Sequence, residues 1–319
     1  MSTTANLFEL HYYLKNDNHL IDATLRNRCE SELLAILYEA AFVLSIDIEL
    51  YSCIPSEGGF RDFWKALGKN NNQITIFLVL TTIILSRIPT TDPEIEKLEK
   101  ELKNLTIEET KLNIEKLKLE LQSLSPNEVD QTKINKAAKI IDKNLKIVKR
   151  RSNLYTLLTN EETVEKIGFS LINSEDGEYY SDERQIPRDN FFRFIISSDT
   201  LRAEVDENAM IEIISPVLKE GRFKWKGVYN ETVISFNMND SEFKEDVLFD
   251  NVAFKHGTCI RCVLRKAREI DEVGDIKITG FNVKTVLEVV EGDAKQLTKQ
   301  GIRYRHNKTL KDSQQDFFG

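Results

Sequence analysis

The residues that come closest to a metal or redox site are His256, Cys259 and Cys262. The two cysteines are separated by two residues, as in many pairs of zinc ligands. In a strand, however, residues three apart point to opposite faces of the sheet, and no second Cys-x-x-Cys or Cys-x-x-His pair completes a set of four ligands. We therefore expect no metal, no cofactor and no thiol chemistry here.

The other histidines, His11, His19 and His306, have no neighbouring serine, cysteine or carboxylate in a pattern typical of a nucleophile with its base. No glycine-rich phosphate-binding loop is present either. The sequence thus predicts a protein that is not an enzyme. An active site assembled from distant positions stays open as a third class of function.

Aromatic and basic residues alternate from Arg222 to Tyr229. In a strand, Phe223, Trp225 and Tyr229 would share one side, and the cations the other. Outward-facing aromatics would stack on bases, whereas inward-facing ones would fill the core of a small barrel, which we favour because the pleat separates them from the cations. The candidates for binding a nucleotide, nucleic acid or other ligand are Arg222, Lys224, Trp225 and Lys226.

A basic amphipathic helix is predicted after Pro126, running to about Leu158. Its candidates for binding an anionic partner are Lys136, Lys139, Lys143, Lys146 and Arg150. Anionic lipid headgroups and a nucleic-acid backbone are the two functional partners considered. The alternative, which we favour, is a solvated face whose cations pair with glutamates of residues 94–120.

Residues 74–86 form an uncharged apolar segment that predicts a helix. It is shorter than the ~20 residues that usually span a bilayer, so it suits either insertion with local thinning or the buried core of an assembly. Residues 60–69 before it predict an amphipathic helix with an aromatic face. The candidates for contact with membrane or assembly are Phe60, Phe63, Trp64, Leu67, Ile76, Phe77, Leu80 and Ile84.

These segments predict an α+β protein. Residues 1–57 form a β-α-β unit, residues 58–90 the amphipathic and apolar helices, residues 91–160 a helical stalk or coiled coil, residues 161–291 a β-rich domain, and residues 292–319 a flexible tail. Strands are predicted at Phe191–Ser197, Met210–Leu218, Arg222–Tyr229, Thr232–Met238, Thr258–Arg268 and Ile276–Val289, with a helix at Ser241–Leu248. From residue 210 this is the element order of an OB-type barrel.

The net charge of −8 limits general affinity for nucleic acid to a local basic face, and four scattered cysteines favour a reducing compartment. We expect a bacterial sensor or effector at the inner membrane with cytoplasmic domains. Its β-domain would recognise a ligand or protein partner while its helices insert or self-associate. This arrangement is similar to that of modular antiphage effectors. The alternative is a cytoplasmic oligomeric scaffold or nucleic-acid-binding protein with the apolar helix buried.

Overall fold

In the computed structural model the chain divides into two units, each with its own β-sheet. The structure describes residues 4–15, 20–53, 60–87, 100–101, 138, 141, 143–219, 221–249, 252 and 254–318. Unit 1 comprises Met1–Asp199 with Ile270–Asp275, and unit 2 comprises Thr200–Glu269 with Ile276–Gly319. Unit 1 therefore extends beyond the boundary predicted near residue 161, because residues 164–187 supply two strands of its sheet.

Unit 1 contains a five-stranded antiparallel sheet in the order β2-β3-β1-β4-β5. Its strands are β1 (Leu7–Leu14), β2 (Glu49–Cys53), β3 (Phe60–Leu67), β4 (Val164–Ile172) and β5 (Arg184–Pro187). The strand, helix and second strand predicted in residues 1–57 are all present, but the two strands are not neighbours, because β3 lies between β1 and β2 in the sheet. These elements are therefore part of a larger domain.

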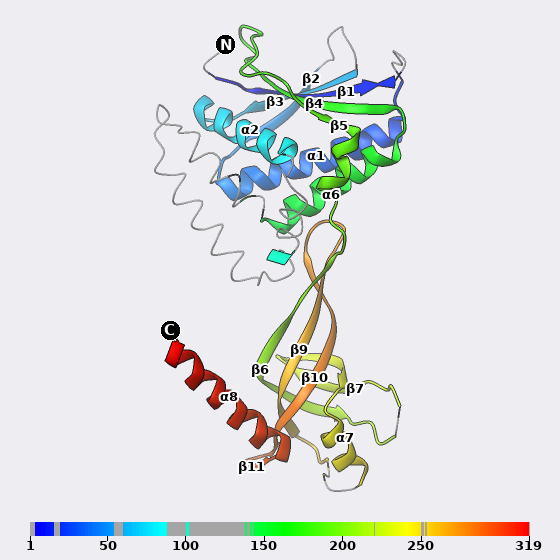
Figure 1. The fold of residues 1–319 in the computed structure, drawn as a ribbon, viewed down its shortest axis with the longest axis vertical. Coiled ribbons are helices and arrows are strands. Elements are labelled where there is room, and N and C mark those ends of the chain that lie inside the picture. The colour runs from blue at the N-terminus through cyan, green and yellow to red at the C-terminus, as the bar shows by residue number, and fades with distance from the viewer. Residues whose placement is uncertain are drawn as a thin grey trace. The chain divides into compact units, whose positions relative to one another are not determined.

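Three helices cover one face of this sheet (Figure 1): α1 (Ala23–Leu44), α2 (Asn71–Ser86) and α6 (Leu145–Asn160). The side chain of Asp22 accepts a hydrogen bond from the Leu25 amide at 2.8 Å and so caps α1. Asn70 and Asn144 cap α2 and α6 in the same way. Each helix thus begins at a residue whose side chain satisfies an otherwise unpaired amide.

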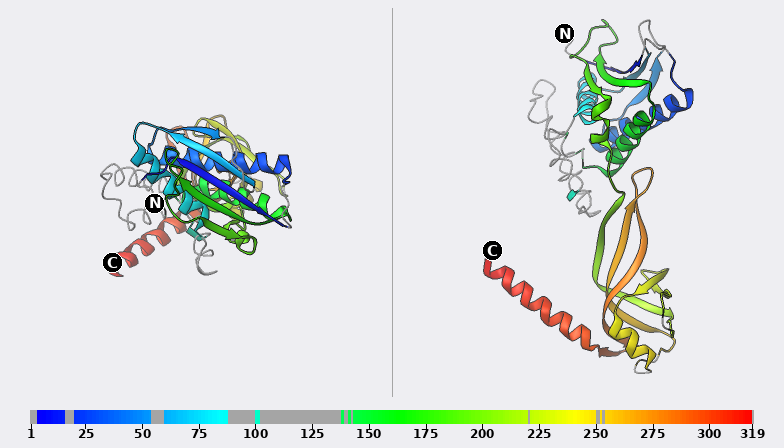
Figure 2. Two further views of the ribbon diagram at one scale, coloured as in Figure 1. Left: turned by 90° about the horizontal axis from the view of Figure 1, so that it is seen from above. Right: turned by 45° about the vertical axis from the view of Figure 1, so that its right-hand side comes forward.

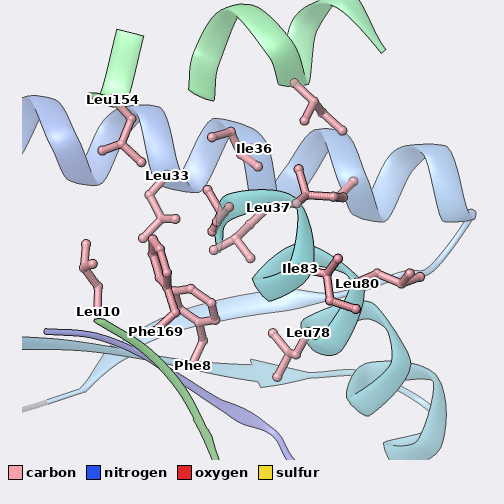
Figure 3. Close-up of a cluster of buried hydrophobic side chains, with 14 of the residues drawn as sticks. Phe8, Leu10, Leu33, Ile36, Leu37, Leu78, Leu80, Ile83, Leu154 and Phe169 are labelled. Atoms are coloured by element: carbon pink, nitrogen blue, oxygen red, sulfur yellow. The ribbon is translucent and has the colours of Figure 1, made fainter. Parts of the chain in front are cut away.

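The side chains of β1 alternate between the helix-covered face of the sheet and its opposite face. Phe8, Leu10 and Tyr12 are buried and belong to the core that the sheet shares with the helices. Figure 3 shows Phe8 and Leu10 in this cluster. Glu9, His11 and Tyr13 consequently project from the face that the helices leave uncovered.

The apolar helix lies inside the core of unit 1. Leu78, Leu80 and Ile83 of α2 belong to one cluster of buried side chains with residues of α1 and the sheet (Figure 3), and Phe77 and Ile84 have no exposed surface. Intrachain packing therefore accounts for its hydrophobicity. Among the helices that the structure describes, none is long and apolar enough to cross a bilayer. Membrane attachment and self-association stay predictions.

The helix predicted at residues 60–69 is wrong: this segment is strand β3. Phe63 and Trp64 are buried, and Trp64 pairs with Phe8 of β1 and Ser52 of β2. Aromatic residues fit a strand as well as a helix, and pairing on both sides decides between them. The strand predicted at Phe191–Ser197 is also wrong, since Arg188–Phe194 is a 3₁₀ helix whose Phe194 stacks on Tyr155 at 4.0 Å.

Unit 2 contains a closed five-stranded β-barrel. Its strands are β6 (Thr200–Ser215), β7 (Trp225–Tyr229), β8 (Thr232–Met238), β9 (Thr258–Ile270) and β10 (Ile276–Glu291), with α7 (Ser241–Leu248) between β8 and β9. The strands β6, β7 and β8 form an antiparallel meander, β8 pairs with β10 in parallel, and β9 closes the barrel against both β10 and β6. The predicted small barrel is confirmed.

Residues 292–319, predicted as a flexible tail, contain regular secondary structure. Residues 294–297 form strand β11 (Ala294–Leu297), which pairs with β10, and α8 (Lys299–Phe318) follows as a helix that is well seen in Figure 2. Arg303, Arg305 and Lys308 of α8 form ion pairs with Glu242, Glu288 and Glu207 of the barrel. These partners are distant in sequence, so the polar composition alone did not reveal them.

The predicted coiled coil falls mostly on residues outside the described ranges.

Candidate functional site

The strongest candidate surface of unit 2 lies where the chain enters β7. Arg222, Phe223 and Lys224 precede the strand, which begins at Trp225, and all three are exposed. Lys226, one residue into the strand, lies opposite Ser235 of β8 and Ser215 of β6. The structure thus places the predicted cations Arg222, Lys224 and Lys226 on the outside of the barrel, and Trp225 inside it.

The three aromatic residues of this segment divide between core and surface. Trp225 is 1% exposed and contacts Phe236, Phe243 and Phe254 in the barrel core. Tyr229 is buried as well, and its hydroxyl donates a hydrogen bond to Asp206 at 2.7 Å. Core packing is therefore confirmed for these two.

Phe223 differs, because 55% of its surface is exposed. It lies before the first paired residue of β7, so the pleat of the strand does not hold it on the inner face with Trp225. The sequence pattern missed this, since an alternation that begins at Arg222 assigns Phe223 to the core. An exposed aromatic side chain therefore lies between two exposed cations in sequence.

The outer face beside Lys226 is partly apolar. Ile214 of β6 and Val233 of β8 are 53% and 64% exposed, and Ser235 is also exposed. Register places Val233 opposite Val228 of β7, next to the Lys226–Ser235 pair. Cationic, hydroxyl and apolar groups therefore share the surface of β6, β7 and β8.

The charges on this surface are available to a partner. Within the described part of the chain, Arg222, Lys224 and Lys226 have no ion pair or side-chain hydrogen bond. Unit 2 contains 19 lysines and arginines against 17 aspartates and glutamates, so the acidic excess of the chain lies in unit 1. The unit that carries this face is therefore not itself acidic.

No family model, curated protein or solved structure matches this chain.

Unlike the cations near β7, the basic residues of α6 and of the segment before it form ion pairs. Lys143 pairs with Glu101 at 2.9 Å, Lys146 with Asp275 at 3.2 Å, and Arg150 with Glu32 at 3.2 Å. Lys136 and Lys139 lie outside the described residues. These three cations are thus paired with acidic neighbours, as the favoured alternative expected. Only Glu101, however, lies within residues 94–120, where the partners were predicted.

The candidate membrane residues also lie in unit 1. Phe63, Trp64, Phe77, Leu80 and Ile84 are buried, Phe60 and Ile76 are half-buried, and Leu67 is 42% exposed. The structure gathers six of the eight in or against one intrachain core, while Phe63 is buried outside that core, opposite Glu9 of β1. They form no continuous exposed surface.

The cysteines of β9 point to opposite sides of the barrel wall, as predicted. Cys262 is fully buried, and burial raises the pKa of its thiol, whereas Cys259 is half-buried. His256 precedes the strand and lines a cavity of about 560 Å³ with Lys255, Phe254 and Leu218. The described residues contain no group of three metal-binding side chains.

Proposed function

We propose that the barrel of unit 2 is an OB-type domain that binds single-stranded nucleic acid through Arg222, Phe223, Lys224 and Lys226. The observation that carries the proposal is the exposure of Phe223 among three cations that have no described partner. Single-strand binders combine these two features, since aromatic side chains stack on bases and cations follow the phosphates.

Strand pairing supports the OB assignment. The meander β6-β7-β8, the helix before β9, the parallel pair β8–β10 and the closure of β9 on β6 give a five-stranded Greek-key barrel. OB domains bind oligonucleotides on their second and third strands and on the loop between the first and second. Here those elements are β7, β8 and residues 216–224, the region that holds the candidate residues.

The test is fluorescence anisotropy with a labelled oligothymidylate of about 16 nucleotides, measured across a salt series. Binding should weaken with salt, and Lys226→Gln should lower the slope of log K against log salt by about 0.7, the value for one phosphate contact on a single strand. Phe223→Ala should weaken binding by about 1–3 kcal/mol through lost stacking.

Lys295→Gln is the matched control, because Lys295 is exposed on β11, removed from β7 and β8 in the sheet order. It should leave the slope unchanged. Absence of binding at low salt, or an equal effect of Lys226→Gln and Lys295→Gln, would refute the proposal.

A further inference from the structure

A polar cluster occupies the face of the unit 1 sheet that the helices do not cover. Glu9, His11 and Tyr13 project from β1, with Arg61 of β3 directly opposite His11 and Ser170 of β4 directly opposite Glu9. The connection from β4 to β5 brings Tyr179 and Glu183 to the same face. Residues from four segments thus converge on one surface.

Two hydrogen-bonded groups hold these side chains in place. In one, Arg61 donates to Glu9 at 2.9 Å and to the hydroxyl of Tyr179 at 3.4 Å. In the other, Tyr13 and Gln185 both donate to Glu183 at 2.6 Å, and His11 Nδ1 lies 3.4 Å from the same carboxylate. The side chains are therefore ordered before any ligand arrives.

Between these groups lies a cavity of about 280 Å³. Its lining contains carboxylates, hydroxyls and one guanidinium, and no aliphatic side chain: Glu9, Arg61, Ser170, Tyr179, Ser181, Asp182 and Glu183. Since the lining has no aliphatic residue, and Tyr179 supplies its one aromatic ring, the cavity does not suit a wholly hydrophobic ligand.

The burial of Glu9 shows that this face is not an ordinary solvated surface. Glu9 is 1% exposed, and burial raises its pKa although Arg61 acts in the opposite direction. Burying a carboxylate costs free energy that an apolar residue would not require. Buried polar networks beside a cavity are common at functional sites, and this network borders one.

We infer that this cavity binds a neutral polyhydroxylated molecule, of the size of a monosaccharide. Three carboxylates against one guanidinium disfavour an anion such as a phosphate. The hydroxyl of Tyr179 accepts a hydrogen bond from Arg61 and can donate its own proton into the cavity. A simple ammonium ion would pair with the carboxylates but has no acceptor for that proton. Sugar hydroxyls both donate and accept, so they complement every side chain of the lining.

The test uses saturation-transfer NMR on the full chain, with glucose, galactose, mannose and N-acetylglucosamine as separate probes. At least one sugar should show transfer to its ring protons. That signal should fall at least tenfold in Glu183→Gln and in Asp182→Asn. Asp182 is exposed and makes no described side-chain hydrogen bond, so its variant should fold even if Glu183→Gln does not.

Glu175→Gln is the matched control, because Glu175 is an exposed carboxylate of the same connection that does not line the cavity. It should keep the full signal. Putrescine and inorganic phosphate test the competing charge classes. The inference fails if no sugar binds, if Glu175→Gln and Asp182→Asn act alike, or if putrescine or phosphate binds in place of the sugars. Nucleic-acid binding by unit 2 is measured separately and does not depend on this outcome.

Discussion

The carboxylate of Glu183 lies directly against the backbone of Gly168. A methyl group on Gly168 would overlap the Glu183 side chain well inside van der Waals distance. Gly168 pairs with His11 across β1 and β4, so its missing side chain makes the space in which Glu183 reaches His11 and Tyr13. Glycine in the middle of this strand therefore allows the Glu183 carboxylate to approach the backbone closely.

Gly168→Ala should therefore displace Glu183 and lower the free energy of unfolding by about 1–3 kcal/mol. Chemical unfolding followed by circular dichroism measures this change. Gly280→Ala is the matched control in another strand, because its nearest neighbour would be the Ala267 side chain at 4.0 Å. That variant should be neutral or stabilising by up to about 1 kcal/mol. Equal losses for both variants would contradict the steric argument.

Tyr13→Phe should change how stability depends on pH. Burial acts to raise the pKa of Glu183, but hydrogen bonds from Gln185 and Tyr13, with the nearby His11, outweigh it and lower the pKa below 4.5. A lowered pKa stabilises the fold above the unfolded value of 4.5, and that contribution is lost as pH falls through the folded pKa. The stability difference between wild type and Tyr13→Phe should thus be largest above pH 4.5 and shrink in acid.

Thermal unfolding over a pH series measures that difference, and NMR titration of Glu183 should show a higher pKa in the variant. A difference that grows as pH falls would contradict the proposed role of the Tyr13 hydroxyl.

Ile84→Ala tests the position of the apolar helix. Ile84 has no exposed surface, so removing its side chain should leave a cavity and lower the free energy of unfolding by about 2–5 kcal/mol. Leu67→Ala, at a residue that is 42% exposed, should cost about 0.5 kcal/mol or less. Denaturant unfolding without detergent measures both. An unchanged stability of Ile84→Ala would show that α2 does not pack as described.

Gly301→Ala tests how α8 is attached. Alanine should favour a helix by about 1 kcal/mol over glycine, but here its methyl group would overlap the backbone of Leu287 in β10. We expect the overlap to prevail and α8 to separate from the barrel, with amide exchange across residues 299–310 faster by tenfold or more. Asn307→Ala, at an exposed position of the same helix, should leave exchange equal or slower. Slower exchange in Gly301→Ala would overturn this account.

Local sequence determined much of unit 2. The helix predicted at Ser241–Leu248 and the strand at Thr232–Met238 coincide with α7 and β8, and β9 and β10 begin at the predicted residues. Short alternating strands separated by turn residues carry their own periodicity, so neighbours within a few residues specify them. The apolar segment at residues 74–86 likewise forms a helix, as predicted.

Only the tertiary structure decided where these elements lie and what they expose. Residues 60–69 have apolar spacing that suits a helix, yet pairing with β1 and β2 makes them a strand. The apolar helix has the composition of a membrane segment, yet α1 and the sheet bury it. Glu9 and Glu183 are 174 positions apart and meet at one cavity. Such contacts depend on strand register and packing between distant segments, which periodicity within a short window does not contain.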